Sequence, residues 1–171
     1  NNERIYGMVS PHAGYMYSGA VAAQGYYKLS SSKFESAIIL GPNHYGLGSE
    51  VAIMNTGSWK TPLGEIEIDS EVAEEIHRNC DIVNIDEQAH SRDHCIEVQL
   101  PFLQYIRKEF KIVPIILINQ GKNTCKKLGN GIYESIKEQN LMPIASSDLT
   151  HYESNSQAYE KDNLLISAIL S

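Results

Sequence analysis

Four of the six histidines lie in short polar strips that could do chemistry. The strips cover residues 11–15, 41–45, 92–97 and 146–152, and they contain His12, His44, His94 and His151 in that order. A neutral imidazole binds transition metals, and it exchanges protons near neutral pH. One histidine after a strand is usually a turn residue, so the repeated placement is what indicates a site.

A divalent metal ion is the first chemistry that these residues suggest. We expect His12 and His44 as imidazole ligands, with Asp148 as the nearest carboxylate. Two histidines and one carboxylate leave open positions for substrate and dioxygen on Fe(II), which makes Fe(II) the first choice. Zinc accepts the same ligands and activates a bound water instead. A site without metal is the remaining alternative, and Asp148 could equally be the N-cap of a short helix.

Acid–base catalysis is expected from His94, with Asp93 or Glu97 orienting its ring. A nucleophilic Cys95 beside His94 is the alternative, but adjacent residues on a strand or helix point apart, which favours a buried, inert thiol. The remaining candidates are His151 as a catalytic residue and Tyr15, Asn43, Tyr45 and Thr150 as substrate-binding residues. Tyrosine rings can wall a pocket and donate a hydrogen bond, although packing in turns explains them equally well. We assign no role to His77 or His90.

Alternating strands and helices must position these strips. Strands are expected over residues 4–10, 36–40, 50–54, 64–68, 112–118 and 142–145, and helices over residues 18–28, 70–78, 101–108, 122–138 and 157–170. This alternation predicts an α/β fold with a mostly parallel sheet and helices on both faces. Three strips follow strands, and ligands of open α/β sheets bind at the carboxyl ends of the strands.

Composition bounds the function classes. The 171 residues are 42% apolar and 20% charged, which is typical of one globular domain. A net charge of -7 argues against nucleic acid and against anionic membrane surfaces. The three cysteines are far apart and predict reduced thiols in the cytoplasm. The longest apolar run is far shorter than a membrane span, and the first residues lack the apolar core of a signal peptide.

Five ordered strings give the chain a resemblance to a known family. They are PHAGY at 11–15 with YSG at 17–19, LGPNH at 40–44, WKTPLG at 59–64, DHCIEVQLPFL at 93–103 and SSDLTHY at 146–152. In order and content they resemble the Memo family, also called AmmeMemoRadiSam system protein B. The resemblance covers nearly the whole chain, and the family is usually longer at both ends. We therefore expect residues 1–171 to be a single Memo-like domain that lacks family segments.

The resemblance implies a three-layer α/β/α sandwich like that of class III extradiol dioxygenases. It matches His12 and His44 to metal-site histidines and His94 to the catalytic histidine, and it implies a metal-dependent, dioxygenase-like oxidoreductase. Thr150 falls where animal Memo proteins carry a cysteine and the dioxygenases a carboxylate ligand. Because a hydroxyl is a poor ligand for Fe(II), we expect Asp148, Glu97 or His151 to complete the site.

Two alternatives to an oxidoreductase stay open. One is a non-catalytic binding or scaffold protein on a degenerate dioxygenase fold, with a pocket for a peptide or a phosphotyrosine-like group. The other is a metal-assisted hydrolase with water activated between His12 and His44. The family name implies a shared pathway with radical-SAM and AMMECR-type proteins as partners.

Overall fold

The computed structural model describes residues 4–137 and 139–170, and it is built around one six-stranded sheet. The strand order is β1-β8-β2-β7-β3-β6. The strands are β1 (Met8–Ser10), β2 (Ser36–Pro42), β3 (Val51–Ile53), β6 (Asn84–Ile85), β7 (Lys111–Leu117) and β8 (Leu141–Ser146). All neighbouring strands are parallel except β3 and β7, which are antiparallel. The sheet is therefore mostly parallel, as predicted.

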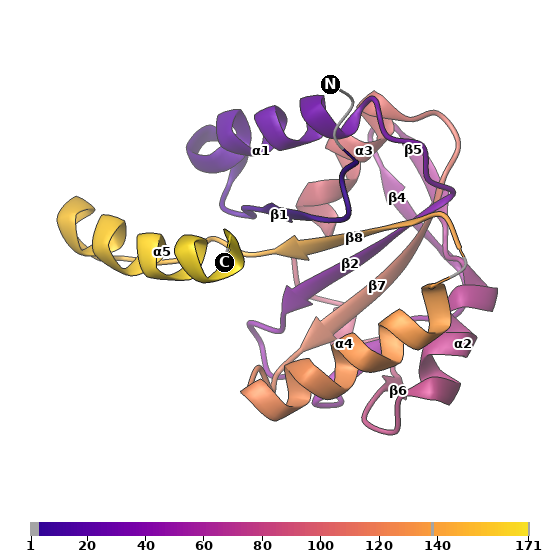
Figure 1. The fold of residues 1–171 in the computed structure, drawn as a ribbon. Coiled ribbons are helices and arrows are strands. Elements are labelled where there is room, and N and C mark those ends of the chain that lie inside the picture. The colour runs from indigo at the N-terminus through magenta and orange to yellow at the C-terminus, as the bar shows by residue number, and fades with distance from the viewer. Residues whose placement is uncertain (1–3, 138, 171) are drawn as a thin grey trace.

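Helices cover both faces of this sheet (Figure 1). Helices α1 (Tyr15–Leu29) and α3 (Leu100–Ile106) lie on one face, and α2 (Ser70–Asn79) and α4 (Lys122–Ile136) lie on the other. Successive residues of β2 pack into different helical layers. Ile39 belongs to the apolar cluster under α1 and α3, and Ile38 belongs to the cluster under α2 and α4. The predicted three-layer α/β/α architecture is confirmed.

Local sequence explains the best-defined elements. Strands β2 and β7 read as continuous apolar runs because both of their faces are covered by helices. Helix α2 buries Val72, Ala73 and Ile76 on one side, and its N-cap Asp69 accepts a hydrogen bond from the backbone N–H of Val72. Helix α3 has a proline in its first turn, where the missing N–H costs nothing.

The sequence prediction failed at short polar strands. The expected strand 64–68 is present as β5 (Gly64–Glu67), but it pairs with the unpredicted β4 (Ser58–Thr61) in a separate hairpin. The charged residues and the Pro–Leu–Gly turn of that hairpin carry little apolar periodicity. The strand expected over 4–10 begins only at Met8, and the helix expected over 122–138 ends at Ile136. Residue 138 lies outside the described residues.

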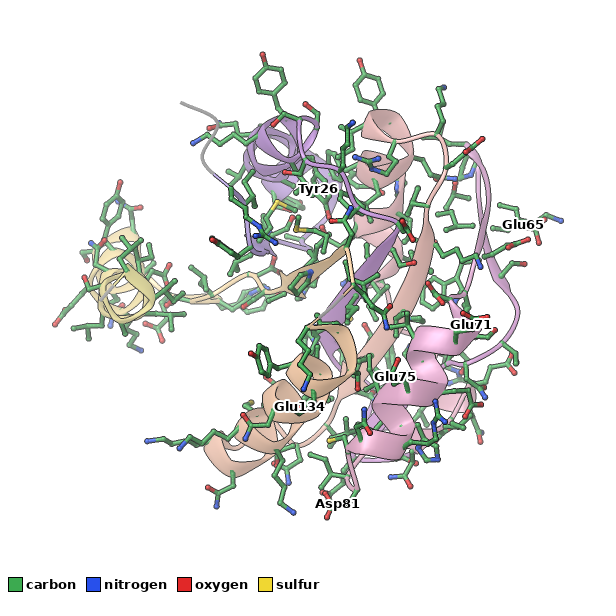
Figure 2. All side chains as sticks on the ribbon, turned by 45° about the vertical axis from the view of Figure 1, so that its right-hand side comes forward. Tyr26, Glu65, Glu71, Glu75, Asp81 and Glu134 are labelled. Carbon is green, nitrogen blue, oxygen red and sulfur yellow. The ribbon has the colours of Figure 1, made fainter. Side chains whose placement is uncertain are left out.

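The last element, α5 (Asn155–Leu170), extends away from the sheet, and none of its residues is buried (Figure 1). The acidic residues labelled in Figure 2 belong to β5, α2, α4 and the loop after α2. Within residues 4–137 and 139–170, no helix combines the length and the apolarity needed to cross a bilayer.

Candidate metal centre

Three of the histidine strips meet at one edge of the sheet. Because β1, β8 and β2 are adjacent and parallel, their carboxyl ends lie together, and His12, Asp148 and His44 each follow one of them. His94 enters from the loop before a 3₁₀ turn at Glu97–Gln99. The ring centroids lie 5.2 Å apart for His12 and His44, 5.9 Å for His12 and His94, and 5.0 Å for His44 and His94.

The angles between the rings separate these three histidines. The plane of His12 makes 82° with that of His44 and 83° with that of His94, whereas His44 and His94 are nearly parallel at 20°. The lone pair of an imidazole nitrogen lies in the plane of its ring. Two stacked, parallel rings therefore cannot both direct lone pairs at one ion, but two perpendicular rings can. His12 with His44, or His12 with His94, is the pair suited to a shared ion.

Asp93 supports His44, not His94 as sequence adjacency suggested. Its carboxylate accepts hydrogen bonds from the backbone N–H of His44 (2.7 Å) and of Cys95 (3.0 Å), and it lies 3.0 Å from Nδ1 of His44. Because a carboxylate only accepts, Nδ1 carries the proton and Nε2 of neutral His44 keeps its lone pair. Burial opposes the charge of Asp93, but the hydrogen bonds from Cys95 and His44 outweigh it and hold the pKa at about 2.

His12 is held neutral and is contacted on both nitrogens. Burial lowers the pKa of His12, although the Asp148 carboxylate acts in the opposite direction, and the nearby His44 and His94 lower it further. Its Nδ1 lies 2.9 Å from the hydroxyl of Ser146, and its Nε2 lies 3.6 Å from Oδ2 of Asp148. A neutral buried imidazole is the form that binds metal.

Asp148 joins the ends of β8 and β1. Its Oδ1 accepts hydrogen bonds from the backbone N–H of His12 (2.6 Å) and of Ala13 (2.9 Å). Its Oδ2 is left to face Nε2 of His12 at 3.6 Å and Nε2 of His151 at 3.4 Å. The alternative reading as an N-cap does not hold, because residues 149–154 form no helix. One carboxylate oxygen thus remains available to a ligand.

Within the described residues, the one group of three potential metal ligands whose ligand atoms all lie within 4.8 Å of one another is His44, Asp93 and His94. We assign Asp93 to support, because both of its oxygens already accept hydrogen bonds. The ring of His94 is exposed, and within the described part of the chain it makes no hydrogen bond. It is therefore free to exchange a proton with a bound molecule.

The predicted substrate-binding residues separate into two groups. Tyr15 and Tyr45 are about half exposed beside the histidine strips, and the Tyr15 hydroxyl donates to the carbonyl of Val98. Asn43 and Thr150 use their polar atoms internally. The Asn43 amide shapes its own loop, through bonds with residues 45, 46 and 47, and the Thr150 hydroxyl donates to Asp162 of α5.

Cys95 fits the expected inert thiol. It is fully buried, burial raises the pKa of its thiol, and its Sγ donates to the carbonyl of Pro42. It packs so closely on Gly41 of β2 that a Cβ at Gly41 would collide with Sγ. This contact places the loop that carries Asp93 and His94 against the end of β2.

Sequence reasoning missed two buried polar residues behind His12. Gln99 is fully buried, and Ser146 is 4% exposed. The signal for Gln99 was present, because it is a polar residue inside the apolar run that leads into α3. Ser146 is the first residue of the polar strip at 146–152, but its neighbours in sequence do not indicate which atom its hydroxyl contacts.

Comparisons with known proteins agree on one family. A family model described as Memo-like protein matches residues 1–171. A MEMO1 family protein of Nitrosopumilus maritimus is 53% identical, and the match covers 99% of this chain and 62% of that protein. One from Sulfolobus acidocaldarius is 50% identical, over 94% of this chain and 58% of that protein. One from Methanocaldococcus jannaschii is 47% identical, over 98% and 62%. The chain thus spans about three fifths of the length of these relatives.

Proposed function

The chain belongs to the Memo family, and from that premise we propose that it is a metal-dependent oxidoreductase. In this proposal one divalent transition-metal ion is held by His12, His44 and Asp148. One observation carries it: the two perpendicular imidazoles are each contacted at Nδ1 from behind, which leaves Nε2 of His44, and Nε2 of His12 beside the Asp148 carboxylate, to bind an ion. Outer partners of this kind are typical of histidines that bind metal.

The spacing of the rings supports this pair. With metal–nitrogen bonds of about 2.1 Å, each ring centroid lies about 3.2 Å from the ion, and two ligand rings at about 90–110° have centroids about 4.5–5.3 Å apart. The 5.2 Å between His12 and His44 falls in this range, and the 5.9 Å between His12 and His94 does not. The carboxylate oxygen of Asp148, 3.6 Å from Nε2 of His12, is close to the separation of two ligands of one ion.

The remaining residues have roles that need no metal geometry. When bound, Fe(II) would supply open positions for a substrate and dioxygen, whereas zinc would activate a water. The ring of His94 can take a proton from a bound hydroxyl group and return it later. Asp93 holds the His44 ring in place, and Tyr15 and Tyr45 flank the opening. We propose a small aromatic or anionic compound as the substrate class.

Metal binding tests the first half of the proposal. We expect the purified protein, loaded anaerobically with Fe(II), to retain one ion per chain after gel filtration. His12→Ala and His44→Ala should each weaken binding by more than about 100-fold, beyond the 10–100-fold typical of outer-shell changes. His77→Ala is the matched control, because this histidine belongs to α2 and its Nδ1 lies 2.8 Å from the Val83 carbonyl. Stoichiometric metal that survives both site variants would overturn the proposal.

Oxygen uptake tests the second half. A catechol added to the iron-loaded protein should be consumed together with dioxygen, and His94→Ala should abolish this turnover while the ion stays bound. Hydrolytic activity with zinc and none with iron would favour the metal-assisted hydrolase instead.

A second candidate function is peptide or protein binding. It is favoured by the four tyrosines next to the strips, Tyr15, Tyr17, Tyr45 and Tyr152, all of which are more than half exposed. Binding of a phosphotyrosine peptide that survives His12→Ala and His44→Ala would support this candidate. Turnover of a catechol would count against it.

A further inference from the structure

The hydroxyl of Ser146 has three polar neighbours, and they determine where its single proton lies. It is 2.7 Å from the carbonyl oxygen of Cys95, which can only accept a hydrogen bond. It is 2.9 Å from Nε2 of Gln99, which can only donate. The Ser146 proton must therefore point at Cys95. The third neighbour, Nδ1 of His12 at 2.9 Å, can form a hydrogen bond only as the donor.

Two further contacts fix the orientation of the Gln99 amide, and with it the assignment of Nε2 as the donor to Ser146. Its Nε2 also donates to the Pro11 carbonyl at 2.9 Å, and its Oε1 accepts from the Tyr26 hydroxyl at 2.7 Å. Turning the amide over would place Oε1 against the carbonyl of Pro11, where no hydrogen can mediate. Burial raises the pKa of Tyr26, so its hydroxyl stays a donor. Figure 2 labels Tyr26 on α1, at the far end of this chain of bonds.

From this geometry we propose that Ser146 and Gln99 are positioning residues that keep the proton of neutral His12 on Nδ1, so that Nε2 presents its lone pair to the metal. The inference rests on the proposed metal site for its purpose, but the position of the proton can be measured without metal. All three residues of the relay, Tyr26, Gln99 and Ser146, are buried, so water does not compete for their bonds.

Asp148 makes this support necessary. Its free Oδ2 lies 3.6 Å from Nε2 of His12 and would accept a proton placed there. The two tautomers of His12 are therefore in competition, with Ser146 favouring the proton on Nδ1 and Asp148 favouring it on Nε2. A proton on Nε2 blocks the nitrogen that faces the proposed ion. Without the hydroxyl of Ser146, Asp148 is the stronger remaining acceptor.

The test is histidine tautomer assignment by long-range ¹H–¹⁵N NMR on the metal-free protein, combined with Fe(II) affinity. Wild-type His12 should show protonated Nδ1 and bare Nε2. Ser146→Ala should move the proton to Nε2, in whole or in part, and weaken Fe(II) binding by about 10–100-fold. Ser146→Thr keeps the hydroxyl and should restore both the tautomer and the affinity.

Ser135→Ala is the matched control. Ser135 is as buried as Ser146, and its hydroxyl likewise accepts from an amide, that of Asn79, and donates to a carbonyl, that of Gly131. It should lose similar stability and leave both the tautomer of His12 and the affinity unchanged.

The outcomes separate this inference from the proposed function. A wild-type His12 with its proton on Nε2 overturns the positioning role, whatever metal is bound. A Ser146→Ala protein that keeps the wild-type tautomer overturns it as well. The expected tautomers with no metal binding in any variant would instead overturn the proposed function and leave the proton relay supported. If Ser146→Ala does not fold, the wild-type spectrum and the Gln99→Met variant decide the question, since Gln99→Met removes the donor that directs the Ser146 proton.

Discussion

His12 and His90 are buried to nearly the same extent, at 4% and 6% exposure, and the protein treats them in opposite ways. His12 is contacted on both nitrogens, by Ser146 and by Asp148. His90 lines a cavity of about 320 Å³ together with Trp59, and within the described residues neither of its nitrogens makes a hydrogen bond of good geometry, although the Ala52 backbone lies close enough to affect the ring. Burial lowers the pKa of both rings.

The difference shows that burial and polar contacts make separate contributions to the state of a histidine ring. Burial alone makes an imidazole neutral, because it disfavours the charged form. Only polar partners decide which nitrogen carries the proton and where the other one points. His90 is neutral because it is buried, but no polar partner in the described part of the chain fixes which of its nitrogens carries the proton. It is therefore not prepared to bind a ligand in a fixed geometry. His12 and His44 have both contributions, which is why we place the metal between them.

The largest expected effect is the loss of folding stability that His90 causes at low pH. Burial lowers its pKa to about 4, only partly offset by the Ala52 backbone and by the carboxylates of Asp86 and Asp93. The unfolded chain binds this proton below about pH 6.5 and the folded chain does not, so stability falls as pH drops from about 6.5 to 4. The pKa difference corresponds to about 3 kcal/mol over this window.

His90→Gln should remove that loss. We expect the variant to be close to wild type at pH 7 in urea unfolding and more stable than wild type by about 2–3 kcal/mol at pH 4.5. His12 loses stability in the same direction in both proteins, so its contribution cancels in the comparison. Parallel stability curves for the two proteins between pH 7 and 4.5 would contradict the assignment.

The second-largest effect is expected at a carboxylate, that of Asp93. The pKa of Asp93 is held at about 2, so its stabilising hydrogen bonds are complete above about pH 4 and are lost as pH falls toward 2. Asp93→Asn should cost about 2 kcal/mol at pH 7, and the gap to wild type should close between pH 4 and 2. It should also weaken metal binding by about 10–100-fold, because an amide offers only one accepting oxygen to the three N–H groups that the carboxylate serves, so Nδ1 of His44 is held less well.

Asp86→Asn is the control for Asp93. Hydrogen bonds from Ser49 and from the backbone of Ala89 also lower the pKa of Asp86 against its burial, but within the described residues it makes no hydrogen bond to a histidine of the metal site. Its variant should lose acid-dependent stability and keep full metal affinity. Equal losses of metal affinity in both variants would mean that Asp93 acts only through overall stability.

A smaller effect is expected from the loop that carries His44. Asn43→Ala removes the bonds of one amide to residues 45, 46 and 47 and should cost about 1 kcal/mol, together with a several-fold loss of metal affinity. Asn119→Ala removes a similar turn contact, to the N–H of Gly121, outside the site. It should cost comparable stability in thermal unfolding and leave metal affinity unchanged, which separates loop shape from general folding.

The smallest effect is expected at Thr150. Its hydroxyl donates to Asp162 of α5 at 2.6 Å. Thr150→Val should cost less than about 1 kcal/mol and change Fe(II) affinity by less than about twofold. A large loss of affinity, measured by calorimetry, would place Thr150 at the ion and reopen the question of the third ligand.

Much of this arrangement could be predicted from sequence because it follows from element order. Parallel strands bring their carboxyl ends to one edge, so the meeting of His12 and His44 follows from two strands and two short strips. The partners behind the rings could not be predicted in this way. Asp93 supports His44, which is 49 residues distant in sequence, and Ser146 supports His12 across 134 residues. Such contacts depend on register and on loop shape, which apolar periodicity does not report.

His90 is a second example of what could not be predicted from the sequence. In sequence it is one more loop histidine, and only its packing against Trp59 reveals that it is buried with no well-formed hydrogen bond to its ring within the described residues. The short strands β4 and β6 were missed for a related reason, because strands of four and two residues are too short to carry a periodic signal.

The shortness of β1 has a consequence for how the site opens and closes. This edge strand has three residues and, in the part of the chain that the structure describes, pairs only with β8, yet it carries the chain directly into His12. The link between His12 and Asp148 closes a loop of 136 residues, so it forms only after most of the chain is ordered. Detachment of this edge by local unfolding would disassemble the site while the inner strands stay paired. Amide hydrogen exchange at residues 8–13 should therefore be faster than in β2, and a bound ion should slow it.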